Sequence, residues 1–297
     1  TQPELLLLAI KIKWKPHQQE VRGIVMSGEY VNISGYRFVA IPDLVEMRWP
    51  LRDLCVDLEL KGTILLSEEG INFFVAGSEK STEKFIAHMD EDERFKGIPV
   101  KTSYSDDQPF KRMLVRLKKE IISMGHDEVK PEKFTSPSIK PTEFKSWLDE
   151  GKEIIVLDAR NDYEMRMGKF QNAIDLNIKS FRDFPTAAKQ LPDELKGTPV
   201  VMYCTGGVRC EKASVVLLEE GFNEVYQLEG GILGYFEECG GAHWDGECFV
   251  FDKRVGVNPE LEETDTVMCF TCREPLLAHE QESEAYIEGQ SCPYCIS

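Results

Sequence analysis

The sequence predicts a mixed architecture: an α+β domain, then an α/β domain with a parallel sheet, then a small cysteine-rich appendage. The chain has 297 residues, about twice the ~150 expected of one domain. The expected strands and helices of residues 36–104 follow the order β-α-β-β-α-β, whereas after residue 141 they alternate one by one. Two Cys-x-x-Cys pairs lie in the last stretch of the chain, at residues 269–272 and 292–295.

The first domain is predicted from apolar periodicity and turn residues. Its expected elements are strands at 36–41, 63–66, 71–76 and 100–104, a helix from Pro42 to about residue 60 with a kink at Pro50, and an amphipathic helix at 81–92. This order is that of a ferredoxin-like, or acylphosphatase-like, split sandwich. Alternating basic and apolar residues at 110–122 predict one more half-exposed strand. The Glu68-Glu69-Gly70 turn is given no catalytic role.

The second domain is predicted from short, continuous apolar strands, which are typical of a buried parallel sheet. Strands at 153–157, 199–203 and 225–228 alternate with helices at 141–148, 211–220 and 231–237. Such alternation indicates an α/β domain. The expected organisation is an extension at 1–29, a first domain at 30–126, a linker at 127–141, a second domain at 142–245 and a tail at 246–297. Met26 is a hypothetical start of the native protein; the alternative is an ordinary peripheral segment.

Composition narrows the class of protein. Hydrophobic residues make up 42% and charged residues 29%, as in soluble globular proteins. A net charge of -17 argues against nucleic-acid binding over the whole surface, although a local basic groove remains possible. The apolar run at residues 5–10 is too short for a membrane span. Nine cysteines without secretion-signal flanks indicate a cytoplasmic protein whose thiols are catalytic or bind metal.

The strongest chemical signal is the segment at residues 200–210, in which an apolar strand runs into Cys204. Glycines let successive N–H groups of the loop point inward, and the following helix adds its positive end. With Arg209 as a nearby cation, Cys204 is expected to be a thiolate facing a cleft. Between the two lie Thr205, Gly206, Gly207 and Val208. A loop of this length suits one sulfur atom better than a phosphoryl group. The alternative is a buried structural cysteine.

A second thiol follows at the start of the expected helix. Cys210 either resolves an oxidised or persulfidated Cys204, or is a small buried residue in the first helical turn. Cys55, Cys239 and Cys248 are interpreted as packing residues.

The four tail cysteines have the spacing of a structural zinc site. Residues 273–291 separate the two Cys-x-x-Cys pairs, which matches the common zinc spacing. Four thiolates would close the coordination sphere, so the metal would be structural. Two redox-active pairs, or four unligated thiols, are the alternatives. The predicted ligands are Cys269, Cys272, Cys292 and Cys295.

One short segment carries a concentration of positive charge on this acidic chain. It is either a strip that contacts RNA phosphates or a solvated strand face. Its basic residues are Lys111, Arg112, Arg116, Lys118 and Lys119.

Residues 154–237 resemble a rhodanese domain. The resemblance includes an Asp-x-Arg-x-x-x-Glu signature at Asp158, Arg160 and Glu164, a Gly-x-x-x-x-Ala motif with Lys169 in place of the usual His, a Gly-Phe piece at 221–222 and a Gly-Gly piece at 230–231. The resemblance implies that Cys204 carries a persulfide. Asp158 and Arg160 are expected to hold the fold rather than act on substrate.

A narrower family resembles the chain from about residue 36 onward. Blocks at 61–72, 127–131, 204–213 and 246–252, together with the tail cysteines, are similar to bacterial rhodanese-domain tRNA uridine hydroxylases. That family forms 5-hydroxyuridine at the wobble position of tRNA, so the resemblance implies a tRNA substrate and molecular oxygen as co-substrate. No flavin or nucleotide fingerprint is present, which leaves Cys204 as the evident redox centre. Neither DNA nor a membrane is an expected partner, and the sequence does not indicate the oligomeric state.

Two other functions fit the same residues. A persulfide sulfurtransferase, supplied by thiosulfate or another sulfane-sulfur donor, would use the same loop. A non-catalytic docking module would share the fold, but the presence of both Cys204 and Arg209 argues against it.

Overall fold

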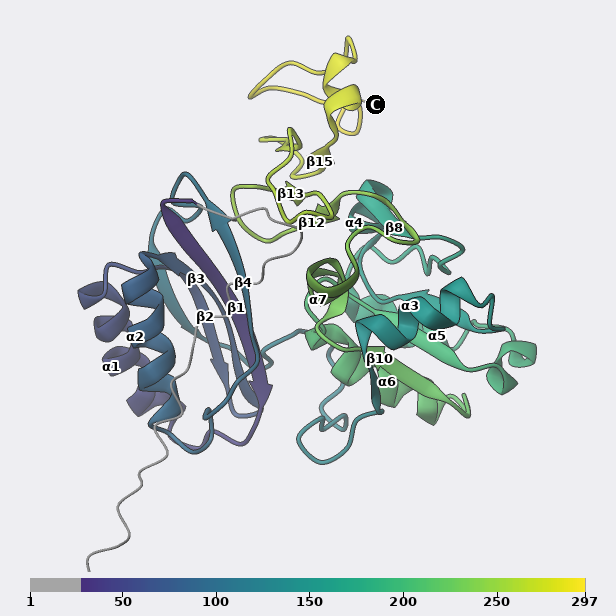
Figure 1. Ribbon diagram of the computed structural model, residues 1–297, viewed down its shortest axis with the longest axis horizontal. Helices are drawn as coiled ribbons and strands as arrows, with labels where there is room; N and C mark the ends of the chain where they lie inside the picture. Colours follow the sequence, from purple (N-terminus) through teal and green to yellow (C-terminus); the bar gives the residue numbers. More distant parts are fainter. Residues whose placement is uncertain (1–27, 297) are drawn as a thin grey trace, which may run out of the picture.

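The computed structural model describes residues 28–296. An α+β domain and an α/β domain lie side by side, and the cysteine-rich tail extends from the second of them (Figure 1). The hypothetical start at Met26 lies outside the described residues. Within those residues, no helix is both long and apolar enough to cross a bilayer.

The first domain is a sheet of five strands in the order β4-β1-β3-β2-β5, in which only β5 runs parallel to its neighbour. This arrangement confirms the predicted fold class. The strand expected at 110–122 is shorter than predicted, and covers only β5. The elements are β1 Tyr30–Phe38, α1 Leu44–Asp57, β2 Lys61–Ser67, β3 Gly70–Gly77, α2 Glu79–Asp90, β4 Val100–Ser105 and β5 Met113–Leu117.

The two faces of this sheet have different partners. Ile33, Phe73 and Phe85 belong to the core under helices α1 and α2, which cover the outer face (Figure 1). Because side chains alternate along a strand, Asn32 and Phe74 lie on the opposite face, toward the second domain. Strand β3 is therefore buried over nearly its whole length, as expected of a strand packed on both faces.

The second domain is a parallel sheet in the order β6-β10-β9-β7 with a core on each face. Its first strand, β6, comes from the segment predicted as a linker, because Ser138 and Ile139 pair with Gln227 and Leu228. The elements are β6 Ser138–Ile139, α3 Pro141–Asp149, β7 Ile155–Asp158, α4 Asp162–Met167, β8 Gly168–Phe170, α5 Phe184–Ala188, β9 Val200–Tyr203, α6 Val208–Glu219, β10 Val225–Leu228 and α7 Gly231–Cys239. Two 3-10 turns lie at Phe181–Asp183 and Asp193–Gly197.

The tail consists of short strand pairs rather than a sheet. Strand β11 pairs with β8 of the second domain, β12 with β13, and β14 with β15. The elements are β11 Trp244–Gly246, β12 Cys248–Phe249, β13 Gly256–Val257, β14 Val267–Met268, β15 Pro275–Leu276 and a 3-10 turn at Ala278–Glu282.

Polar contacts join the first domain to helix α6. The Lys212 ammonium lies 2.8 Å from Glu69 Oε2 and 2.7 Å from Glu120 Oε2. Lys212 and Glu120 are buried, and Glu69 is nearly so. The Tyr36 hydroxyl donates a hydrogen bond of 3.1 Å to Glu211 Oε1. Helix α6 begins directly after the Cys204 loop, so these contacts place the first domain over that loop.

Candidate active site

The loop after β9 holds its cysteine in the geometry predicted from the sequence. Gly207 has a φ of 100°, a left-handed conformation that glycine adopts without strain. Its N–H thereby turns inward and donates a hydrogen bond of 3.1 Å to Cys204 Sγ. A Cβ at Gly207 would lie only 2.9 Å from the Tyr36 hydroxyl, so the first domain closely approaches this loop.

The first turn of α7 fixes the backbone of the same loop. The N–H of Ile232 donates to the Cys204 carbonyl at 3.0 Å, and the N–H of Leu233 donates to the Thr205 carbonyl at 3.1 Å. Gly231 has a φ of 64°, and a Cβ there would lie 2.4 Å from the Cys204 carbonyl oxygen. The Gly-Gly pair at 230–231 thus permits a backbone approach that a side chain would block.

The surroundings of Cys204 favour its ionised form. Burial alone raises its pKa, but a hydrogen bond from the Cys210 thiol, the charge of Arg209 and backbone N–H groups lower the pKa to about 6. Burial, the hydrogen bond to Cys204 and the charge of Cys204 raise the pKa of Cys210 well above its usual value. At neutral pH the pair is therefore one thiolate and one thiol, with Cys210 as the donor.

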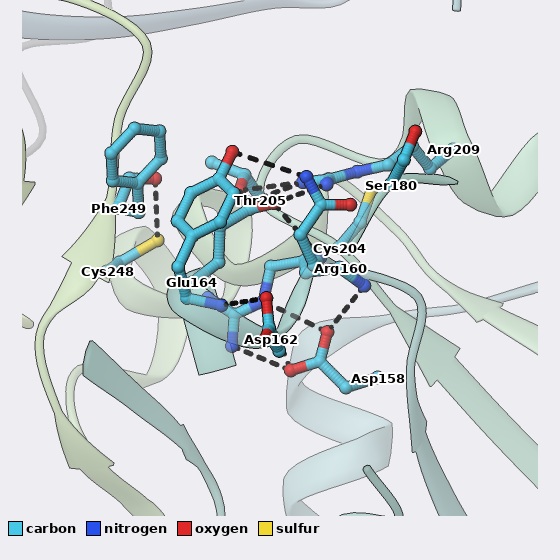
Figure 2. Close-up of polar contacts among 12 residues, drawn as sticks. Asp158, Arg160, Asp162, Glu164, Ser180, Cys204, Thr205, Arg209, Cys248 and Phe249 are labelled. Carbon is cyan, nitrogen blue, oxygen red and sulfur yellow. Dashed lines mark hydrogen bonds and ion pairs between the residues drawn. The ribbon is translucent and has the colours of Figure 1, made fainter. Parts of the chain in front are cut away.

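The Arg209 guanidinium is also part of an ion pair with Glu164, as Figure 2 shows. Its guanidinium forms two bonds to Glu164, with Nη1 to Oε2 at 2.6 Å and Nη2 to Oε1 at 2.7 Å. Both side chains are buried. The pKa of Glu164 is lowered because Arg209 outweighs the opposing effect of burial. The sequence predicted Arg209 as the cation of the loop but did not pair it with Glu164.

A second buried ion pair lies beside the first. Arg160 Nη2 contacts Asp158 Oδ2 at 2.7 Å and donates to the Gly168 carbonyl at 2.7 Å (Figure 2). These bonds join the end of β7 to the start of β8. Neither side chain is solvent-exposed, which is the setting of residues that hold a fold.

The expectation that the thiol faces a cleft does not hold in this conformation. Cys204 has 0% of its surface exposed. A cleft lies between the two domains and reaches Thr205, but Cys204 is not among its lining residues. The physical reason is the close approach of Tyr36, which covers the loop from the first domain.

The four tail cysteines converge. Their Sγ atoms all lie within 4.8 Å of one another. The thiolates of a tetrahedral zinc site with Zn–S distances of ~2.3 Å are about 3.8 Å apart, and two of the present S–S distances are 3.4 and 3.6 Å. The cluster therefore has the dimensions of a metal site with four sulfur ligands.

The basic strip lies on β5 and its flanks, at the edge of the first sheet. All five of its basic side chains are exposed. Lys119 is paired with Asp127 at 2.7 Å, so four of the five have no ion pair among residues 28–296. The strip is separate from the Cys204 loop, but Phe110, at its start, lines the interdomain cleft.

Several residues around the site have no local signal in the sequence. Tyr36, Glu69 and Glu120 come from the first domain or its end, and Phe251 comes from the tail. Only Lys212 carries a clue, because it lies within the apolar stretch that becomes the buried face of α6.

Comparison with known proteins agrees with the two domains. Residues 30–121 match the UPF0176 acylphosphatase-like domain, and residues 140–238 match the rhodanese-like domain. A solved rhodanese-like domain from Anabaena is 23% identical, with a TM-score of 0.32 over 37% of this chain and 80% of that one. Another, from Staphylococcus aureus, is 28% identical, with a TM-score of 0.29 over 35% and 94%.

The fold and the cysteine loop define a rhodanese-type enzyme joined to an acylphosphatase-like domain. The tRNA uridine(34) hydroxylase of Cupriavidus pinatubonensis is 49% identical over 90% of this chain and 97% of that protein. The one from Ralstonia nicotianae is 46% identical over 90% and 96%. This chain belongs to the tRNA uridine(34) hydroxylase family.

Proposed function

We propose that this enzyme hydroxylates C5 of uridine 34, the wobble uridine of tRNA, with Cys204 as its reactive group. The observation that carries the proposal is the near-full-length similarity to enzymes named for this reaction. The Cys204 loop supports it, because a buried sulfur held as a thiolate is a redox-active nucleophile.

The overall reaction needs molecular oxygen and a reductant. One oxygen atom enters the C5–H bond of uracil, and the other leaves as water after taking up two electrons and two protons. We assign the reductant to the thiol class, because Cys210 hydrogen-bonds Cys204 and the two thiols can supply two electrons and two protons by forming a disulfide, which an external thiol then reduces. Cys210 is then the residue that resolves an oxidised Cys204.

Arg209 and the loop residues Thr205, Gly206, Gly207 and Val208 are proposed to hold the sulfur rather than to react. The Gly207 N–H contacts the sulfur directly, while Arg209 and Thr205 bind Glu164. The loop thus keeps its shape through the Glu164 carboxylate.

We further propose that Cys269, Cys272, Cys292 and Cys295 bind a structural zinc ion. Their Sγ atoms have the spacing that four-sulfur zinc ligation requires. Four protein ligands leave no open coordination position, so the ion would stabilise the tail and take no part in the reaction. The ion would also stabilise helix α4 indirectly, because the tail contacts that helix. Arg166 of α4 pairs with Glu280 at 2.5 Å and also with Glu274.

The basic strip is proposed to contact tRNA phosphates. Its exposed cations contrast with a net charge of -17 for the chain. Replacement of Lys111 and Arg112 by Glu is expected to weaken tRNA binding and to make the remaining binding less dependent on salt concentration. Unchanged binding at low salt would make the strip an ordinary solvated face. The proposed place of action is the cytoplasm, where tRNA is modified.

A persulfide sulfurtransferase is the second function that the same site favours, because the N–H groups and Arg209 would also stabilise a persulfide on Cys204. Two assays separate the two functions. The first measures 5-hydroxyuridine in tRNA nucleosides from a strain lacking this gene, with and without the intact gene restored. The second measures sulfur transfer from thiosulfate to cyanide by the purified protein. The proposal predicts loss and recovery of 5-hydroxyuridine; an unchanged nucleoside profile together with rapid sulfur transfer would overturn it.

A further inference from the structure

We infer that the interdomain cleft beside Thr205 binds the uracil base of the substrate, stacked on Phe251. This inference rests on the proposed function and adds the place of the base. The cleft is bounded by the inner face of the first sheet, by the Cys204 loop and by the start of the tail. Neither the fold nor the cysteine chemistry requires an aromatic ring there.

Phe251 is exposed although the loop that carries it is held firmly. Its side chain is 49% exposed. The N–H of Val250 donates to the Val255 carbonyl at 2.8 Å, and the N–H of Lys253 donates to the Pro109 carbonyl at 3.3 Å. Arg254 Nη1 donates to Ser103 Oγ at 2.8 Å. The loop is therefore anchored to the first domain through Lys253 and Arg254, two and three residues after Phe251.

The ring of Phe251 connects the cleft to the catalytic loop. The Arg209 guanidinium carbon lies 5.8 Å from its centroid. The rings of Phe249 and Phe74 lie 5.0 and 6.3 Å from the Phe251 centroid. A base stacked on the open face of Phe251 would lie beside Thr205, the residue next to the reactive cysteine.

The charge of the cleft fits a neutral ring rather than a phosphate. Lys101 and Arg254 line it together with Glu237 and Asp252, so two cations are matched by two carboxylates. Arg254 is moreover paired with Asp252 at 2.6 Å. A bound phosphate would find no net positive charge here. Uracil is uncharged and planar at neutral pH, and it carries both hydrogen-bond donors and acceptors.

The remaining lining suits such a ring. Apolar residues form most of the walls, including Phe74, Leu233 and Val257, while Ser34 and Thr102 contribute hydroxyl groups. Pockets for small ligands have the same mix of apolar walls with a few polar groups. The enclosed part of the cleft measures only about 40 Å³, so a base turned out of an anticodon loop would lie at its mouth, against the exposed Phe251 ring. Enzymes that modify bases commonly bind an extruded base in this way.

The first test measures binding, so that it is independent of oxygen and reductant. Two anticodon stem-loop RNAs are compared, one with uridine at position 34 and one with an abasic residue there. Base stacking on an aromatic ring is worth ~1–3 kcal/mol, so the intact protein should bind the uridine RNA roughly fivefold or more tightly. Phe251→Ala should lose this preference, Phe251→Trp should keep it, and the exposed Phe134→Ala is the matched control that should also keep it.

The second test locates the base directly. A stem-loop with 5-bromouridine at position 34 is irradiated with the Cys204→Ser protein, and the cross-linked peptide is identified by mass spectrometry. The inference predicts a cross-link to the segment around Phe251. A cross-link confined to the basic strip, or a Phe251→Ala protein that still prefers the uridine RNA, would overturn it. Neither result would affect the nucleoside analysis that tests the proposed function, so the two can fail separately.

Discussion

Arg209 and Glu164 form a buried ion pair with two bonds, of 2.6 and 2.7 Å, directly behind the Cys204 loop. Thr205 joins the pair through hydrogen bonds of 3.3 Å to both partners. Because the carboxylate balances most of the charge of Arg209, the low pKa of Cys204 depends also on the Cys210 thiol and on backbone N–H groups. The pair therefore shapes the loop as much as it supplies charge.

Removal of Glu164 should destabilise the protein strongly. Breaking a buried ion pair leaves an uncompensated charge and costs about 3–5 kcal/mol of unfolding free energy. Glu164→Ala is expected to show this loss in denaturant unfolding, and Glu164→Gln a smaller one because it retains a hydrogen-bond acceptor. A loss below about 1 kcal/mol for Glu164→Ala would mean that the pair does not hold the loop.

Lys212 should be essential for packing of the first domain against α6. Lys212→Met leaves Glu69 and Glu120 as two buried carboxylates without their shared cation. We expect a loss of about 3 kcal/mol or more in unfolding free energy. Lys189→Met is the matched control, because Lys189 is 62% exposed and its contact with Glu220 is 3.8 Å long. Equal effects of the two substitutions would contradict the account.

The cluster of Lys212, Glu69 and Glu120 also predicts that the free energy of unfolding depends on pH. Burial raises the pKa of Glu120, but Lys212 and the backbone N–H groups of Met124 and Gly125 lower it overall. A group whose folded-state pKa is lowered contributes stability above its unfolded pKa, near 4.3, and loses it as the pH falls through the folded-state pKa. Unfolding free energy should therefore fall below about pH 4 in the native protein. Glu120→Gln should show a shallower decline over this range, and an identical decline would remove Glu120 from the explanation.

Tyr36 should control access to the reactive sulfur. Its hydroxyl lies against Gly207 and binds Glu211, and Cys204 has no exposed surface. Tyr36→Ala is expected to raise the rate of Cys204 alkylation by iodoacetamide roughly tenfold, because less of the structure must open. Peptide mass spectrometry separates this rate from those of other thiols. Tyr36→Phe keeps the ring and should change the rate much less; equal rates in all three proteins would show that another element covers the sulfur.

Metal removal should affect the tail before the rest of the chain. A strong chelator, or Cys292→Ser, is expected to release about one zinc ion per chain and to raise hydrogen exchange over residues 265–296. Cys239→Ser is the control, because Cys239 lies outside the cluster of four. Protein purified without chelators that contains no bound metal would contradict the zinc assignment.

The sequence was sufficient for the fold class because each domain has its own periodicity. Single apolar strands between helices predicted the parallel sheet, and the order of elements at 36–104 predicted the split sandwich. Strand β6 lies within the segment predicted as a linker, and it is too short to show a period in the sequence. Its place depends on pairing with β10, about 90 residues later in the chain.

The loop around Cys204 was predictable because its residues are consecutive and glycine has a specific conformational role. The covering of this loop by the first domain was not predictable. Tyr36 lies 168 residues before Cys204, and nothing in the sequence around it indicates the contact. The same holds for Glu69, which was interpreted as part of a simple turn, and for Phe251. Contacts between domains depend on surface shape, which a single sequence does not display. Glu164 is the intermediate case: the motif identified the residue but not its partner.

The central claim is that Cys204 is ionised at neutral pH, and a titration of thiolate absorbance tests it most directly. Absorbance is followed against pH in the native protein and in Cys204→Ser, and the difference between the two curves reports this one sulfur. The account predicts a midpoint near pH 6. A midpoint at or above about 8.5, the value of free cysteine, would contradict it.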